Sequence, residues 1–348
     1  MIVVAGEVLV DLIVGPDGVV DPRLGGGPYN AARTLARLGA PTTFFGGLAD
    51  DRFGRLLRGA LETEGVAIGV PAPSAAPTTL ALVDLDEAGV ASYAFYLSGT
   101  AAADLEYPAL AAAFRAILAA ARAADAADLV DDSVDGDATG GRADAAAAGP
   151  AVAVHVGALG LVMEPIGSAV ERLLLTDVPP DALVMLDPNC RPGAIADRAA
   201  YLGRIGRIAA RADVVKASVD DLAYLYPGSP PAEAAESLLA AGPALVLVTD
   251  GPRPARAFLP GAVLTVEVPS VHVVDTIGAG DAFGGGFLAW WSANGRTRAD
   301  LKRPPLVRSA VQAAAAAAAA TCTRPGADPP TLADLIAAHA WPPPTPDA

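Results

Sequence analysis

Short apolar runs alternate with helical patterns along most of the chain, and this alternation limits the possible folds more than any other feature. The runs have the length and composition of buried parallel strands: Ile2–Val4, Thr42–Phe45, Val152–Val156, Leu183–Leu186, Val214–Val215 and Leu245–Val248. Helical patterns occupy Tyr29–Leu38, Arg52–Glu64, Pro108–Ala123, Gly167–Leu175, Ala199–Ala212, Ala232–Ala241, Ala282–Ala293 and Leu306–Thr321. We therefore predict an α/β fold, a doubly wound and mostly parallel sheet with helices on both faces.

Two stretches depart from this pattern because they alternate with period two and contain no helix. They are Val8–Val20 and Thr78–Leu97, the second with a turn at Asp86–Gly89. Such stretches predict a small antiparallel β-sheet that stands off the main domain as a lid. We assign residues 1–10, 26–75 and 101–340 to the α/β domain and residues 11–25 and 76–100 to the lid.

Two further segments are expected to lie outside the packed core. Residues 131–149 are rich in Ala, Asp and Gly and predict a flexible insertion. Residues 341–348, rich in proline, predict a disordered tail.

Charge and cysteine content exclude several classes of partner. A formal net charge of −15 and a pI of about 4.5 argue against nucleic acid or an anionic membrane surface. No apolar run reaches the roughly 20 residues of a membrane helix, and the N-terminus lacks a basic segment before its first strand. Cys190 and Cys322 are too few for a disulfide framework. We expect a cytoplasmic location.

A glycine turn at Gly278-Ala279-Gly280 places Asp281 at the start of a helical pattern. Backbone N–H groups of such a turn can approach an anion, and the helix dipole favours negative charge there. Asp281 can then take the proton from an attacking hydroxyl, as phosphoryl transfer to an alcohol requires. The alternative is an ordinary turn that Asp281 caps. The spacing fits neither a Walker A loop nor a dinucleotide fingerprint.

Polar residues follow several of the predicted strands and should line one crevice, because ligands bind at the carboxyl ends of strands in such sheets. Asp187, Asn189 and Arg191 combine an acid, an amide and a guanidinium that could clamp a phosphate or a polyol. Asp221 could hold Mg²⁺ through water, although helix capping is the alternative. Thr249 follows the next strand.

The N-terminal region offers groups for a polyol. Gly26 and Gly27 precede Pro28, which suits a first helical turn, and the Asn30 amide can donate to and accept from hydroxyls. Asp11, in the run Gly6-Glu7-Val8-Leu9-Val10-Asp11, can accept hydroxyl hydrogens. A solvated turn is the alternative for Asp11.

These motifs, in this order from Gly6 to Ala327, resemble the PfkB (ribokinase-like) carbohydrate kinases. The matching segments are the GGxPxN pattern, the DPNxR segment, the K-x-S-x-x-D segment and the DTxGAGD signature. The GE-x-L-x-D start and the GGGPYN form look closer to fructokinase-like members than to ribokinase itself. The resemblance implies an ATP-dependent kinase with Mg²⁺ that phosphorylates a primary hydroxyl of a sugar.

The resemblance also implies residue roles. Asp281 matches the catalytic base, with Gly278, Ala279 and Gly280 as the anion hole. The residues that match sugar ligands are Asp11, Gly26, Gly27, Asn30 and Arg191. Those that match the nucleotide side are Ser218, Thr249, Gly251, Gly278 and Gly280. Asp221 falls in a metal-linked element, and Asp275 matches a monovalent-cation (K⁺) site of some members.

Ser218 and Asp221 stand where the family has Asn and Glu, and Pro254 replaces a usual glycine. We expect a fructokinase-like enzyme, because Thr78–Leu97 contains no Lys or Arg and favours a neutral acceptor. The alternatives are a kinase for 2-keto-3-deoxygluconate, ribose, a nucleoside or a sugar phosphate, and a catalytically silent sugar-binding protein. A homodimer through the lid is a further expectation.

Overall fold

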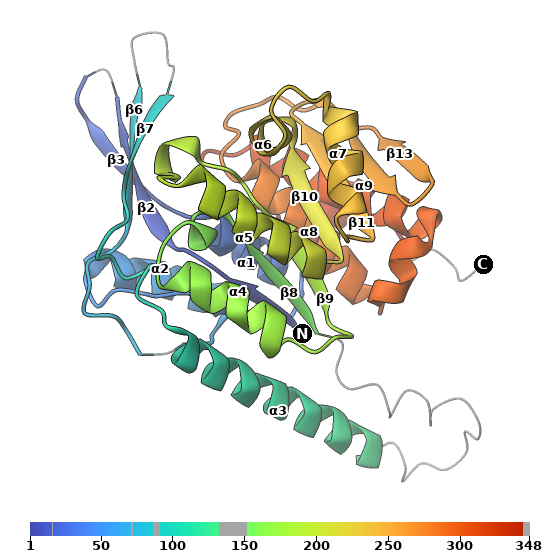
Figure 1. The fold of residues 1–348 in the computed structure, drawn as a ribbon, viewed down its shortest axis with the longest axis horizontal. Helices are drawn as coiled ribbons and strands as arrows, with labels where there is room; N and C mark the ends of the chain where they lie inside the picture. Colours follow the sequence, from blue (N-terminus) through green and yellow to red (C-terminus); the bar gives the residue numbers. More distant parts are fainter. Residues whose placement is uncertain (16, 71, 86–90, 132–151, 344–348) are drawn as a thin grey trace.

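The computed structural model describes residues 1–15, 17–70, 72–85, 91–131 and 152–343. They form a nine-stranded sheet, with helices on both faces, and a separate four-stranded sheet at one end (Figure 1). The predicted fold class is confirmed.

The nine-stranded sheet has the order β13-β12-β11-β10-β9-β8-β1-β4-β5. Every strand predicted from an apolar run is present, and neighbours from β11 to β5 pair in parallel. Their bounds are β1 Ile2–Ala5, β4 Thr42–Phe45, β5 Ala67–Ile68, β8 Ala153–Gly157, β9 Leu183–Asp187, β10 Val214–Ser218 and β11 Leu245–Asp250. The hairpin β12 (Arg253–Leu259) and β13 (Ala262–Val266) extends the sheet antiparallel to β11.

Helices cover the two faces of this sheet. One face packs against α3 (Tyr107–Asp131), α4 (Ile166–Thr176), α5 (Arg198–Arg211), α6 (Val219–Leu225) and α7 (Pro231–Ala240). The other packs against α1 (Gly27–Arg37), α2 (Arg52–Thr63), α8 (Ala279–Ala293), α9 (Pro304–Cys322) and α10 (Leu332–Ala337). Three 3₁₀ turns complete the described elements: η1 (Ala158–Leu161), η2 (Pro192–Ala194) and η3 (Arg298–Lys302).

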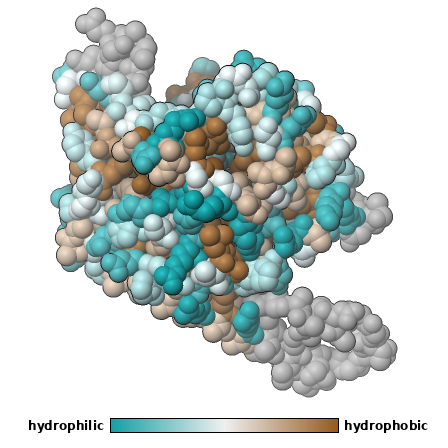
Figure 2. Space-filling view, viewed as in Figure 1, coloured by the Kyte–Doolittle hydropathy of each residue, from teal (hydrophilic) through white to brown (hydrophobic). Residues whose placement is uncertain are grey.

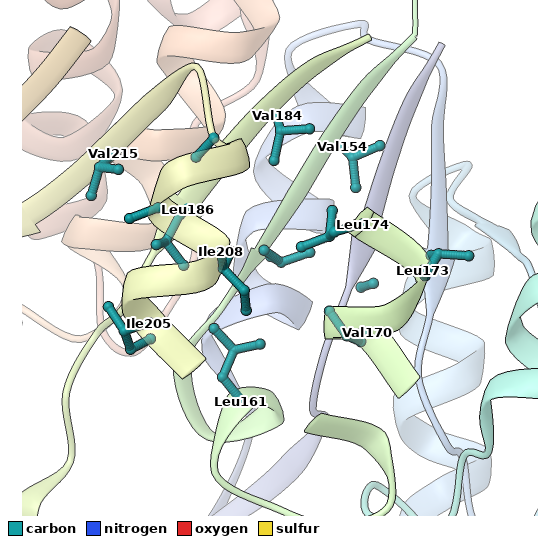
Figure 3. Packing of buried hydrophobic residues seen from close by; sticks show 14 of the residues in the cluster. Val154, Leu161, Val170, Leu173, Leu174, Val184, Leu186, Ile205, Ile208 and Val215 are labelled. Carbon is teal, nitrogen blue, oxygen red and sulfur yellow. The ribbon is translucent and has the colours of Figure 1, made fainter. Parts of the chain in front are cut away.

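The core is built from small and branched aliphatic side chains. Figure 3 shows Val170 of α4 and Ile208 of α5 in one cluster with Val154 and Val184 of the sheet, and all four are fully buried. Burial of such side chains stabilises the fold by about 1.5–3 kcal/mol each. On the opposite face α8 and α9 approach closely, since a Cβ on Gly286 would lie 3.0 Å from a Cα atom of α9. The alanine-rich α9 is therefore a buried helix.

The smaller sheet has the order β3-β2-β6-β7 and stands off the main domain (Figure 1). Its strands are β2 Leu9–Val14, β3 Val20–Gly25, β6 Leu80–Leu85 and β7 Ala91–Tyr96. The hairpins β2–β3 and β6–β7 are antiparallel, as predicted, whereas β2 and β6 pair in parallel. Both hairpins leave the main sheet in the same direction, which makes their inner strands parallel.

The predicted insertion and tail lie mostly outside the described residues. Asp131 ends α3, and residues 132–149 are not among those described. Of the predicted tail, the Pro342 carbonyl oxygen accepts a hydrogen bond of 3.0 Å from Trp290 Nε1, and residues 344–348 are outside. No helix in the described ranges combines the length and the hydropathy that crossing a membrane requires.

Candidate active site

The glycine turn before α8 has the backbone that an anion site needs. Gly278 is the N-cap of α8, with φ of 78°, in the left-handed region. A Cβ at this position would lie 2.6 Å from the Ala327 Cβ, so only glycine fits. The first N–H groups of a helix have no intrahelical acceptor, and the helix dipole adds positive potential. The turn can therefore bind an anion.

Asp281, in the first turn of α8, lies where three elements meet and is 8% exposed. Asn30 Nδ2, from α1, donates to Asp281 Oδ2 at 2.9 Å. Asn189 Nδ2, from the segment after β9, donates to Asp281 Oδ1 at 3.4 Å. Asn30 Oδ1 is buried without a hydrogen-bond partner among the described residues, which leaves an acceptor beside the carboxylate.

The electrostatic surroundings raise the pKa of Asp281 to about 7. Burial is the main cause, and the nearby Asp187 carboxylate raises the pKa further. The Asn30 hydrogen bond and the cations Lys216 and Arg191 act in the opposite direction. A carboxyl group with this pKa can act as a general base close to neutral pH.

Lys216, which belongs to the K-x-S-x-x-D segment but had no predicted role, lies directly beneath the turn. Its Nζ donates to Asp187 Oδ2 at 2.9 Å, and both residues are 3% exposed. A Cβ on Gly280 would come within 2.9 Å of this Nζ. The available sequence signal was a lysine inside an otherwise apolar strand, because a buried lysine requires a partner.

Of the residues expected to bind the sugar, Asn30 and Gly27 lie against Asp281. A Cβ on Gly27 would lie 3.4 Å from Asp281 Oδ1, and Gly26 is the N-cap of α1. Asp11, on β2, has a pKa raised to about 6 by burial, and Arg191 opposes this rise. The exposed Arg191 guanidinium donates to the carbonyl oxygens of residues 189 and 190 and influences the pKa of both Asp11 and Asp281.

The residues expected on the nucleotide side lie on adjacent strand ends. Ser218 ends β10 and is the register partner of Thr249 on β11, and Gly251 follows in the turn to β12. Asp221 forms a capping box with Ser218, accepting from Ser218 N at 2.8 Å and Oγ at 2.7 Å. Asp221 Oδ1 accepts from Cys190 N at 2.6 Å, which ties α6 to the segment after β9. Capping, the alternative role of Asp221, is thus present.

Asp275 joins the turn before α8 to the loop after α9. Its carboxylate accepts hydrogen bonds from Ile277 N at 3.0 Å and from Gly326 N at 2.8 Å. In the described ranges no three His, Cys, Asp or Glu side chains converge in a way that would hold a metal ion. A separate pocket of about 520 Å³ between Leu161–Glu164 and the start of α5 contains none of the expected site residues.

Comparisons with known proteins identify the family and the fold. A family model described as pfkB family carbohydrate kinase matches residues 1–154 and 180–334. The chain is 35% identical over 294 residues to a fructokinase of Rhizobium leguminosarum bv. trifolii, covering 83% of this chain and 79% of that protein. It is similar to the crystal structure of a Xylella fastidiosa fructokinase with bound ATP, with a TM-score of 0.78 and 26% identity over 97% of each chain. A Vibrio cholerae O395 fructokinase in a fructose-, ADP- and calcium-bound form gives a TM-score of 0.76 and 25% identity over 97% of each chain.

Proposed function

Because the chain belongs to the pfkB family of carbohydrate kinases, we propose that it transfers the γ-phosphoryl group of ATP to a primary hydroxyl of fructose. The observation that carries this proposal is Asp281, held by Asn30 next to the anion turn at the start of α8. The similar proteins are named fructokinases, and two of their structures contain ATP or fructose with ADP.

In this mechanism Asp281 takes the proton from the sugar hydroxyl while the hydroxyl oxygen forms a bond to the γ-phosphorus of ATP. The bond between that phosphorus and the bridging oxygen breaks, and ADP leaves. The turn at Gly278–Gly280 stabilises the negative charge on the transferring group through backbone N–H groups and the helix dipole. Asn30 orients the carboxylate of Asp281, which must be ionised to act, so activity rises with pH up to about 7.

The residues at the site fit a neutral acceptor. Asp11 has carboxylate oxygens to which no donor in the described part of the chain is bonded, and Asn30 Oδ1 is a buried acceptor without a partner. Both can accept hydrogen bonds from sugar hydroxyls. Accordingly, Asp11→Ala should raise the KM for fructose, while the KM for ATP stays within twofold of wild type.

The proposal includes Mg²⁺, which neutralises charge on the nucleotide phosphates when bound. Asp187 Oδ1 is buried without a hydrogen-bond partner among the described residues, and the Asp221 carboxylate influences the pKa of Asp187. These two carboxylates would hold Mg²⁺ through water, since this ion keeps several waters. For K⁺ we propose the vicinity of Asp275. A related Vibrio cholerae fructokinase variant has been crystallised in a potassium-bound form.

A second candidate function is phosphorylation of an anionic sugar, and Arg191 favours it. The Arg191 guanidinium is exposed and donates only to backbone carbonyls within the described ranges, so it is available to a carboxylate or phosphate. The lid supplies Arg23 as well, but Arg23 is ion-paired with Asp21.

Steady-state ADP release with a panel of acceptors distinguishes the two functions. Fructose should give a higher kcat/KM than 2-keto-3-deoxygluconate or fructose 6-phosphate, because an acceptor that leaves the polar groups of a site unmatched is penalised. Preference for either anionic sugar would assign the acceptor site to Arg191 and refute the neutral-acceptor proposal. Absence of turnover with every sugar would instead support a silent binding protein.

We also propose that two chains associate through the lid. Its strands expose large apolar side chains, and Figure 2 shows apolar atoms among polar ones on the lid at the upper left. These side chains are Val19, Val20, Tyr93 and Tyr96, each more than half exposed. Large apolar side chains that are exposed to solvent favour protein contacts. Sedimentation should show a dimer that Tyr96→Glu dissociates, and a wild-type monomer would refute this association.

A further inference from the structure

Glu7 is a buried carboxylate at the junction between the main sheet and the lid. It lies between β1 and β2 and is 1% exposed. Glu7 Oε1 accepts a hydrogen bond from Gly27 N at 3.0 Å, and Oε2 accepts one from Gly160 N at 2.7 Å. Gly27 opens α1 and Gly160 belongs to η1, after β8. One side chain therefore joins three segments that are distant in the sequence.

The backbones at this junction approach so closely that side chains are excluded. A Cβ on Gly160 would lie 2.7 Å from the Gly6 Cα, and a Cβ on Gly26 would lie 3.0 Å from the carbonyl oxygen of Glu7. The next residue, Gly27, is the one whose Cβ would lie 3.4 Å from Asp281 Oδ1. The position of Glu7 therefore affects how the start of α1 lies against the Asp281 carboxylate.

We propose that Glu7 is a positioning residue for the sugar acceptor, which holds the Gly26–Gly27 turn in register with Asp281 by accepting one N–H from each neighbouring segment. This inference rests on the proposed function, because the turn is placed at the sugar. Only an ionised carboxylate offers two acceptor oxygens and no donor. A glutamine of the same shape would place its NH₂ group against one of the two N–H groups, leaving a buried donor unsatisfied.

Glu7→Gln tests the proposal, with Asp213→Asn as its matched control. Asp213 is also a buried carboxylate, 4% exposed, and it accepts Val184 N at 2.8 Å, but it precedes β10 at the opposite end of the strands. Assays at pH 8 lie above the pKa of about 7 that burial gives to Glu7. We expect Glu7→Gln to raise the KM for fructose at least ~10-fold, the range for a lost hydrogen bond to a charged group, and the KM for ATP less than twofold.

Asp213→Asn should lower the melting temperature without changing either KM. A fructose KM within twofold of wild type for Glu7→Gln, together with a lowered melting temperature, would show that Glu7 has only a structural role. Should Glu7→Gln fail to fold, Glu7→Asp retains a carboxylate that is one methylene shorter, and it should give a smaller rise in the fructose KM. An unchanged KM in Glu7→Asp would overturn the proposal.

Hydrogen exchange in the wild-type protein gives a second readout that needs no variant. The Gly27 and Gly160 amides should exchange slowly, because both are bonded to a buried carboxylate. Rapid exchange at Gly27 would contradict the proposed positioning. The two proposals remain separable, since lack of fructose turnover by the wild type refutes the proposed function, whereas exchange at Gly27 tests the role of Glu7 directly.

Discussion

Replacing Asp281 by asparagine should stabilise the folded protein while it disables catalysis. The pKa of Asp281 is raised from 3.8 to about 7 in the folded chain, chiefly by burial. A folded state that prefers the protonated form loses stability as the pH rises from 3.8 to about 7. One pH unit corresponds to about 1.4 kcal/mol, so Asp281 costs the wild type about 4 kcal/mol at pH 8, where it is ionised, and about 2 kcal/mol at pH 5, where the folded chain must take up a proton that the unfolded chain lacks.

Asparagine has no charge to bury, and its oxygen can still accept the hydrogen bond from Asn30. Urea unfolding should therefore show that Asp281→Asn is more stable than wild type by up to about 4 kcal/mol at pH 8 and by about half as much at pH 5. The kcat should fall ~10²–10⁴-fold through loss of the general base. A variant with near-normal turnover would remove Asp281 from the chemistry.

Asp334 provides a control, because its pKa is shifted in the direction opposite to that of Asp281. Its pKa is lowered to about 2 by hydrogen bonds from Arg324 and from Thr331, so it stabilises the folded state above pH 4. Asp334→Asn should be less stable than wild type at pH 8 and should keep its activity. If Asp281→Asn gains no stability at pH 8, or if its gain is the same at pH 5, the burial argument for Asp281 is refuted.

Two other substitutions test the structure beneath the anion turn. Lys216→Met leaves Asp187 as an unpaired buried charge and should cost about 3–5 kcal/mol in urea unfolding. Adding Asp187→Leu should recover most of this loss, and no recovery would refute the unpaired charge as its cause. Gly278→Ala should reduce kcat strongly in steady-state assays, because the φ of 78° and the 2.6 Å approach to a neighbouring side chain distort the turn. Gly59→Ala, in α2, is its control: a Cβ at this position meets nothing within 4 Å, so the substitution should leave kcat unchanged. Equal effects of the two glycine substitutions on kcat would refute the role of the turn.

Elements with a strong local pattern could be predicted, and those without one could not. Apolar runs such as Leu183–Leu186 identified the parallel strands because burial on both faces removes polar residues from a strand. The hairpin of β12 and β13 was missed, since Arg253 and Pro254 interrupt its alternation at the outer part of the sheet. Both residues stand at the start of β12, beside a register irregularity in its pairing with β11, and such a position tolerates proline and charge, so its sequence carries less information.

The motifs along the chain determined the family and predicted the glycine turn and the proposed base, because each motif consists of residues that are neighbours in sequence. Tertiary structure alone decided the chemistry around Asp281. Its hydrogen-bond partner Asn30 is 251 positions away, and the Lys216–Asp187 pair comes from two separate strands. Burial and electrostatic interactions act through space, so the raised pKa of Asp281 and the junction held by Glu7 exist only once the chain has folded.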